Sequence, residues 1–148
     1  MVDLSRVGAV FTGTAPYAVS RAKITEFADA VGARSPLHHS PEAAVEAGYS
    51  DVVAPPTFAV VIAQRAESEY IADPASGIDF SRVVHANEGF THTRPLVAGD
   101  LVSTAVHVDG LTERAGITMV TTRTEITDDG GAHVATVVST LAVRGESA

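Results

Sequence analysis

The order of the predicted elements constrains this chain more than any other feature, because its helix signals precede residue 83 and its strand signals follow it. β-Branched residues are dense in four runs, which predict strands at about 83–94, 101–109, 117–127 and 133–144. Turns are predicted at Gly99-Asp100, Arg114-Ala115-Gly116 and Asp128-Asp129-Gly130-Gly131. The two-residue strand period places four apolar residues of the last run on one face: Ala135, Val137, Leu141 and Val143. This sheet face must cover another element.

A long helix before these strands is the natural partner for that face. Pro55-Pro56 interrupts the backbone pattern, and a helix is predicted from Thr57 to about Ala72. Its first half is apolar, whereas its second half, residues 64–69, is polar enough to reach solvent. The shorter elements predicted from their caps are a strand at 17–20, a helix at 21–31 after Ser20, and a helix at 41–47 between Ser40 and Gly48.

Helices followed by a β-meander indicate an α+β architecture. With 148 residues, 45% of them hydrophobic, the chain can bury one substantial core, so we expect a single domain over residues 1–148. One long helix wrapped by an antiparallel sheet is the plan of a hot-dog fold, although the pattern alone makes this only one candidate. A sheet of this kind has an edge that needs a partner, which predicts a dimer.

Composition argues against several classes of function. The formal net charge is −8, with 18 acidic against 10 basic residues, so nucleic acid and anionic membrane surfaces are unlikely partners. The chain has no cysteine, which excludes disulfides and thiolate nucleophiles and removes sulfur ligands from any metal site. We expect neither metal nor cofactor, because phosphate-binding glycine loops and metal-binding motifs are absent from the sequence. A poor signal peptide and the lack of a spanning apolar run predict a cytoplasmic protein.

Two stretches resemble a known family. The run Val31-Gly32-Ala33-Arg34-Ser35-Pro36-Leu37-His38, with the later Val53-Ala54-Pro55-Pro56-Thr57-Phe58, resembles the hydratase motif of MaoC-like hot-dog proteins. Residues 90–100, from Phe90 through Arg94-Pro95 to Gly99-Asp100, resemble the strand and turn of the amino-terminal dehydratase domains of that family. The resemblance extends from about residue 17 to residue 100 and is specific for the family rather than for a substrate.

The resemblance implies a cofactor-free reaction, the reversible loss of water from a (3R)-hydroxyacyl thioester of coenzyme A or acyl carrier protein. Such chemistry needs a base, an acid and donors for the thioester oxygen. His38 matches the catalytic histidine of the family, but Ala33 stands at the aspartate position and Ser35 at the asparagine position. Since alanine cannot carry a proton, we expect the chain's own catalysis to be weak or absent.

Candidate substrate-binding residues also follow from the resemblance, and they are Ser35, Pro56, Thr57, Phe58, Asn87 and Glu88. Pro55-Pro56 removes two amide donors from the start of the long helix, while Thr57 keeps one. A Pro-Pro pair here is familiar from amino-terminal, substrate-holding dehydratase halves. We expect Arg94 and Asp100 to fix their loop and His39 to face solvent.

The other histidines, His85, His92, His107 and His133, are interpreted as structural, since the sequence pairs none of them with an acidic residue or a metal-ligand spacing. Three hypotheses remain open. The chain is a dehydratase subunit whose MaoC-like partner chain supplies the aspartate and histidine; or a homodimeric hydratase whose carboxylate is Glu88 or Asp100; or a binding protein for acyl thioesters without a reaction. Hydrolysis must be tested too, since thioesterases share the fold.

Overall fold

The computed structural model describes residues 1–146 and is built around an antiparallel sheet. Its strands lie in the order β1 (Val10–Phe11), β4 (Leu101–Arg114), β5 (Ile117–Asp128), β6 (His133–Arg144) and β3 (Val83–His92), and β2 (Tyr17–Ala18) also pairs with β4. Every pairing is antiparallel. The four long predicted strands are therefore confirmed. Their predicted meander order holds for β4, β5 and β6 but is wrong for β3, which crosses over to pair with β6 and not with β4.

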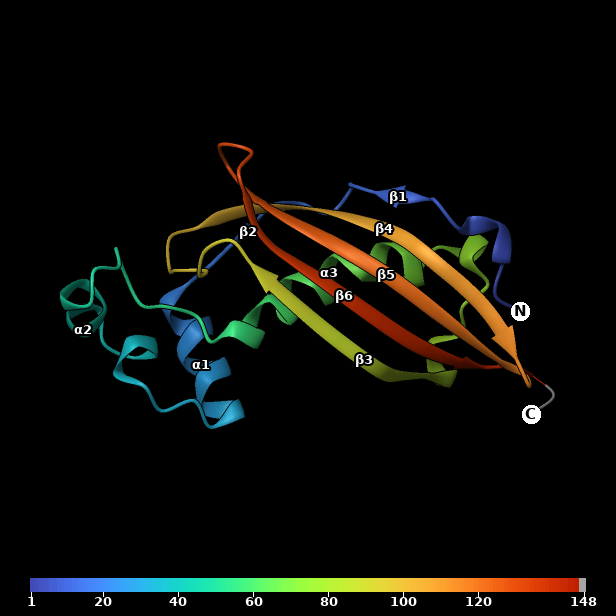
Figure 1. Ribbon diagram of the computed structural model, residues 1–148, viewed down its shortest axis with the longest axis horizontal. Coiled ribbons are helices and arrows are strands. Elements are labelled where there is room, and N and C mark those ends of the chain that lie inside the picture. The colour runs from blue at the N-terminus through green and yellow to red at the C-terminus, as the bar shows by residue number, and fades with distance from the viewer. Residues whose placement is uncertain (147–148) are drawn as a thin grey trace.

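The long helix lies along the concave face of the curved sheet (Figure 1). It begins with the 3₁₀ turn η3 (Pro56–Phe58) and continues as α3 (Ala59–Ile71), close to the predicted bounds. The apolar faces of β6 and α3 meet in the core, where Val137 and Ile62 are buried. This antiparallel wrap around a central helix is the hot-dog arrangement.

Two short helices lie at one end of the sheet, beside the start of α3 (Figure 1). They are α1 (Arg21–Val31) and α2 (Pro41–Glu46), joined through the 3₁₀ turn η2 (Pro36–His38). The predicted caps are present, because the hydroxyls of Ser20 and Ser40 accept hydrogen bonds from backbone amides of the first helical turns.

Three local predictions were wrong. The second long strand was predicted to end at residue 109. In the structure β4 continues to Arg114, because a bulge between Val108 and Gly110 shifts the register and keeps the strand paired with β5. β1 was missed, since two residues give no periodic signal. Glu67, placed in the solvent-reaching half of the helix, is only 2% exposed, because α3 turns this side chain toward the sheet.

β3 forms one edge of the sheet, with β6 on one side and no strand on the other among residues 1–146. Its residues 84–87 are exposed, including Val84 at 66%. An exposed edge of this length carries unpaired backbone groups that favour pairing with another chain.

Candidate functional site

His38 is held at the end of η2 by the extended segment 52–54. Its Nδ1 bonds to the carbonyl oxygen of Val53 at 2.5 Å, and the amide of Val53 donates to the carbonyl of Leu37 at 2.8 Å. Because a carbonyl can only accept, Nδ1 carries a proton in this contact, which leaves Nε2 as the ring nitrogen that is not engaged by Val53. The backbone thus fixes the orientation of the His38 ring.

The same extended segment places His38 beside the loop that follows β3. Ala54 donates to the carbonyl of Leu96 at 2.8 Å, and Ala98 donates to the carbonyl of Val52 at 3.0 Å. Between these segments lies an open depression of about 370 Å³. Its lining consists of His38, Val53, Ala54, Pro56, His92, Thr93, Arg94, Pro95 and Leu96. His38 and the start of the long helix therefore share one mostly apolar depression.

His92 is a member of this site that the sequence reasoning interpreted only as structural. Its Nε2 bonds to the carbonyl oxygen of Pro56 at 2.8 Å, which ties the end of β3 to the start of η3. Its Nδ1 is buried and has no hydrogen-bond partner within the described residues. No spacing in the sequence links His92 to Pro56, because only the packing of β3 against the helix start brings them together.

The motif residues around His38 serve the turn. Ser35 is exposed, and its hydroxyl accepts a hydrogen bond from the amide of Leu37 at 3.3 Å, so it caps η2. The carbonyl of Ala33 bonds to Nε2 of His39 at 3.2 Å, and His39 is exposed as expected. At the aspartate position of the family, the methyl side chain of Ala33 offers no proton-transfer group.

Of the predicted binding residues at the start of the long helix, one lies at the surface and another lies in the core. Thr57 is exposed and is the first residue of η3 with an amide, because the two prolines have none. Phe58 is 0% exposed and packs edge-on against Phe27, with ring centroids 5.5 Å apart. In this chain, Phe58 therefore supports the helix start from the core and does not line the open depression.

Asn87 and Glu88 do not lie in the His38 depression. Glu88 is four residues before His92 on β3, about 13 Å away along an extended strand. Its carboxylate lies 3.8 Å from Nδ1 of His85, and burial raises the pKa of Glu88 against the opposing effects of Ser139 and His85. Asn87 is exposed.

The sequence interpretation missed the acidic neighbours of two histidines. His85 lies beside Glu88 on the same strand. Nε2 of His133, on β6, lies 3.3 Å from the carboxylate of Glu125 on the neighbouring strand β5. Within residues 1–146, no group of three or more His, Asp or Glu side chains is arranged to hold a metal ion.

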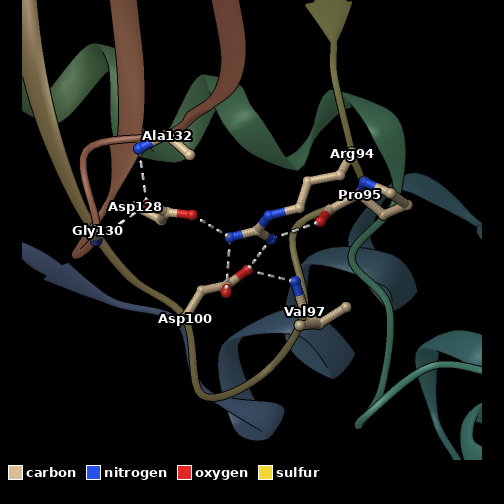
Figure 2. A network of polar contacts seen from close by, with 7 residues as sticks. All are labelled: Arg94, Pro95, Val97, Asp100, Asp128, Gly130 and Ala132. Carbon is tan, nitrogen blue, oxygen red and sulfur yellow. Dashed lines mark hydrogen bonds and ion pairs between the residues drawn. The ribbon is translucent and has the colours of Figure 1, made fainter.

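Arg94 and Asp100 fix the loop between β3 and β4, as predicted (Figure 2). The guanidinium donates to both oxygens of Asp100, at 2.9 and 3.1 Å, and lies 3.6 Å from Asp128, the last residue of β5. Asp100 also accepts from the amide of Val97 at 2.9 Å. Two backbone amides and Arg94 hold the pKa of Asp128 below its ordinary value, with the amide of Ala132 the largest cause. Asp100 is thus occupied by structural contacts.

Comparison with known proteins agrees with this geometry. A family model described as "FAS1-like, dehydratase domain region" matches residues 5–137. The chain belongs to this family. A relative, a UPF0336 protein of Saccharopolyspora erythraea, is 50% identical over 144 residues, which are 97% of this chain and 92% of the relative.

Solved structures give the same result. A MaoC-like dehydratase is 31% identical with a TM-score of 0.88, over 97% of this chain and 43% of that longer chain. A C-terminally truncated HadBC complex of Mycobacterium tuberculosis, named a (3R)-hydroxyacyl-ACP dehydratase, is 29% identical with a TM-score of 0.83, over 93% of this chain and 96% of the other. The MaoC-like hot-dog resemblance is confirmed. No helix within residues 1–146 has the length and apolar character needed to cross a membrane.

Proposed function

We propose that the chain is the acyl-thioester-binding subunit of a (3R)-hydroxyacyl-thioester dehydratase, and that a MaoC-like partner chain supplies the catalytic aspartate and histidine. One observation carries the proposal. The depression at the helix start keeps His38, and Thr57 is exposed next to its wall residue Pro56, while Ala33 stands where the family has its carboxylate. Such a site retains groups for binding but lacks one of the two proton carriers that dehydration requires.

The relatives support a paired arrangement. The HadBC structure, similar over nearly the whole of both chains, is named as a complex. In the present chain the exposed edge of β3 offers an extended surface for a second sheet. A partner docked there completes the sheet and brings its own catalytic side chains to the shared groove.

The positions of the alternative carboxylates argue against a self-sufficient site. Asp100 is held by the two terminal guanidinium nitrogens of Arg94 and by the Val97 amide. Glu88 lies toward the other end of β3, beside His85. Neither lines the depression that contains His38.

The residues present suit a binding role. The Thr57 amide, at the start of a helix where amides lack internal partners, donates to a thioester oxygen. The apolar wall from Val53, Ala54 and Leu96 packs against the acyl carbons. His38, with its proton on Nδ1, accepts a hydrogen bond from the 3-hydroxyl through Nε2.

The test is hydration of crotonyl-CoA by the purified chain alone and mixed with a MaoC-like chain that carries an intact Asp-x-Asn-Pro-x-His motif. We expect the mixture to reach enzymatic rates, roughly 1–10³ s⁻¹, and the isolated chain to fall far below them. Full activity of the isolated chain would establish a homodimeric hydratase. Binding of the thioester without any activity in either sample would leave a binding protein, and release of free coenzyme A would indicate a thioesterase.

A further inference from the structure

A chain of hydrogen-bonded side chains leads away from the His38 depression along the sheet. It begins at Thr93, an exposed residue of the loop after β3 that lines the depression. The Thr93 hydroxyl lies 2.5 Å from Nδ1 of His133, the first residue of β6. Nε2 of His133 lies 2.7 Å from the hydroxyl of Thr136, which in turn lies 2.5 Å from the carboxylate of Glu125 on β5. Thr93 is thus the end of the chain that a small molecule can reach.

The carboxylate at the other end fixes the direction of these hydrogen bonds. An ionised carboxylate can only accept, so the hydroxyl proton of Thr136 is donated to Glu125. The oxygen of Thr136 must then accept from Nε2 of His133, which therefore carries a proton. In an uncharged imidazole only one nitrogen is protonated, so Nδ1 has a lone pair and accepts the proton of the Thr93 hydroxyl.

Glu125 is held in its ionised form. Burial raises the pKa of Glu125, but the hydrogen bonds from Thr136 and Arg123 outweigh it, so that the pKa lies below its ordinary value. Arg123 donates to the second oxygen of Glu125 at 2.8 Å and is itself held by Asp109 at 2.9 Å. The accepting end of the chain is therefore charged at neutral pH.

The arrangement can also accommodate a proton that moves from Thr93 to His133. Such a transfer converts the imidazole into a cationic imidazolium. Oε2 of Glu125 lies 3.3 Å from Nε2 of His133, close enough to stabilise that positive charge directly. A hydroxyl, an imidazole that accepts its proton and a carboxylate that stabilises the imidazolium are the three parts of an activated nucleophile.

The depression beside Thr93 suits an acyl donor with a short apolar chain. Val53, Ala54 and Leu96 contribute apolar wall. Among the lining residues, which all belong to the described part of the chain, Thr93 has the one hydroxyl. An acyl group that enters the depression therefore meets one activated oxygen.

We propose that the Thr93 hydroxyl is a nucleophile that accepts an acyl group from activated esters, with His133 as its base. Oγ1 of Thr93 forms a bond to the acyl carbonyl carbon while its proton passes to Nδ1 of His133. The bond from that carbon to the leaving oxygen breaks, and the leaving group takes the proton from His133. The products are an O-acyl ester on Thr93 and the free alcohol, and no further reactant is needed.

The test is acylation of the purified full chain by p-nitrophenyl butyrate. Competing reactions are few, because the chain has no cysteine and one lysine, Lys23. Release of nitrophenolate gives the rate, and peptide mass spectrometry locates the butyryl group. Hydroxylamine removes an ester on Thr93 but leaves an amide on Lys23, which separates the two products. We expect a hydroxylamine-sensitive butyryl group on Thr93.

Four variants test the roles of the two residues. Thr93→Val should abolish acylation at this position, whereas Thr93→Ser should retain it, because serine keeps the hydroxyl. His133→Gln should slow acylation about 10²–10⁴-fold, the usual contribution of a placed base. The matched control is Thr91→Val, at an exposed position of β3, which should react like the parent.

A hydrogen-bond chain that only ties the loop to β6 would leave Thr93 no more reactive than Thr91. That result overturns the proposal, as does an unchanged rate in His133→Gln or the absence of an ester on Thr93. Because p-nitrophenyl butyrate is neither a thioester nor a substrate for hydration, these outcomes are independent of the proposed dehydratase role.

Discussion

Nε2 of His92 donates to the carbonyl oxygen of Pro56 at 2.8 Å, so that the last residue of β3 anchors the first residue of the central helix. Replacing His92 with Ala removes this donor from an exposed contact, which should lower the free energy of unfolding by about 0.5–1 kcal/mol. Urea denaturation measures the loss. The control is His107→Ala, at a half-buried position of β4, and an equal loss in both variants would show that the Pro56 contact has no special role.

Restoring the family motif should create activity. In Ala33→Asp with Ser35→Asn, the new carboxylate supplies the missing proton carrier, and the asparagine can still cap the turn as Ser35 does. We expect hydration of crotonyl-CoA to rise by about 10²–10⁴-fold over the parent, the usual effect of a placed acid or base.

His38→Ala added to that variant should abolish the gain, which serves as its control. If the parent already works at enzymatic rates and the double change leaves the rate unaltered, Ala33 is not the defect and another group moves the proton.

Phe58 should be essential for stability. It is fully buried against Phe27, so Phe58→Ala should lower the free energy of unfolding by about 3–5 kcal/mol through the cavity it leaves. Phe80→Ala is the matched control, because Phe80 is 69% exposed and its loss should change stability by less than about 0.5 kcal/mol. A neutral result for Phe58→Ala in guanidinium denaturation would place this ring at the surface.

Stability should fall with rising pH where Glu67 titrates. The pKa of Glu67 is raised in the folded protein above its ordinary value of 4.5, so between the two values the folded state binds more protons than the unfolded state. The contribution of protonated Glu67 to the free energy of unfolding is therefore fully present below pH 4.5. It is lost as the pH rises through the pKa of Glu67 in the folded protein.

Glu67→Gln should flatten this dependence, because an amide does not titrate. Unfolding free energies measured between about pH 4 and 8 check the slope, and Glu46→Gln should retain the slope of the parent. A variant with the unaltered slope would assign the effect to another group, first of all Glu88, whose pKa burial also raises.

Association should depend on the edge of β3. We expect the chain to sediment as a dimer at micromolar concentration, and Val84→Lys to dissociate it, because a lysine on an exposed edge opposes strand pairing. Leu101→Lys is the control, since Leu101 is 45% exposed but lies on β4 between β2 and β5. A stable monomer of the parent would contradict the dimer.

Sequence alone determined the elements whose signals are local. The helix starts at Ser20 and Ser40 follow from caps that bond to amides a few residues away, and the apolar face of β6 follows from a two-residue period. The loop role of Arg94 and Asp100 was also predictable, because these residues are six positions apart across one turn. The departure at Ala33 is likewise a property of the motif itself.

Tertiary structure decided everything that depends on distant segments meeting. His92 joins the His38 depression only because β3 packs beside the helix start, and nothing in its neighbouring residues signals that. Glu67 looked like a solvent-facing helix residue, since its sequence neighbours are polar, yet α3 turns it onto Thr122, 55 positions away. Local periodicity assigns a residue to a face, but only the packing of α3 against the sheet determines what that face meets.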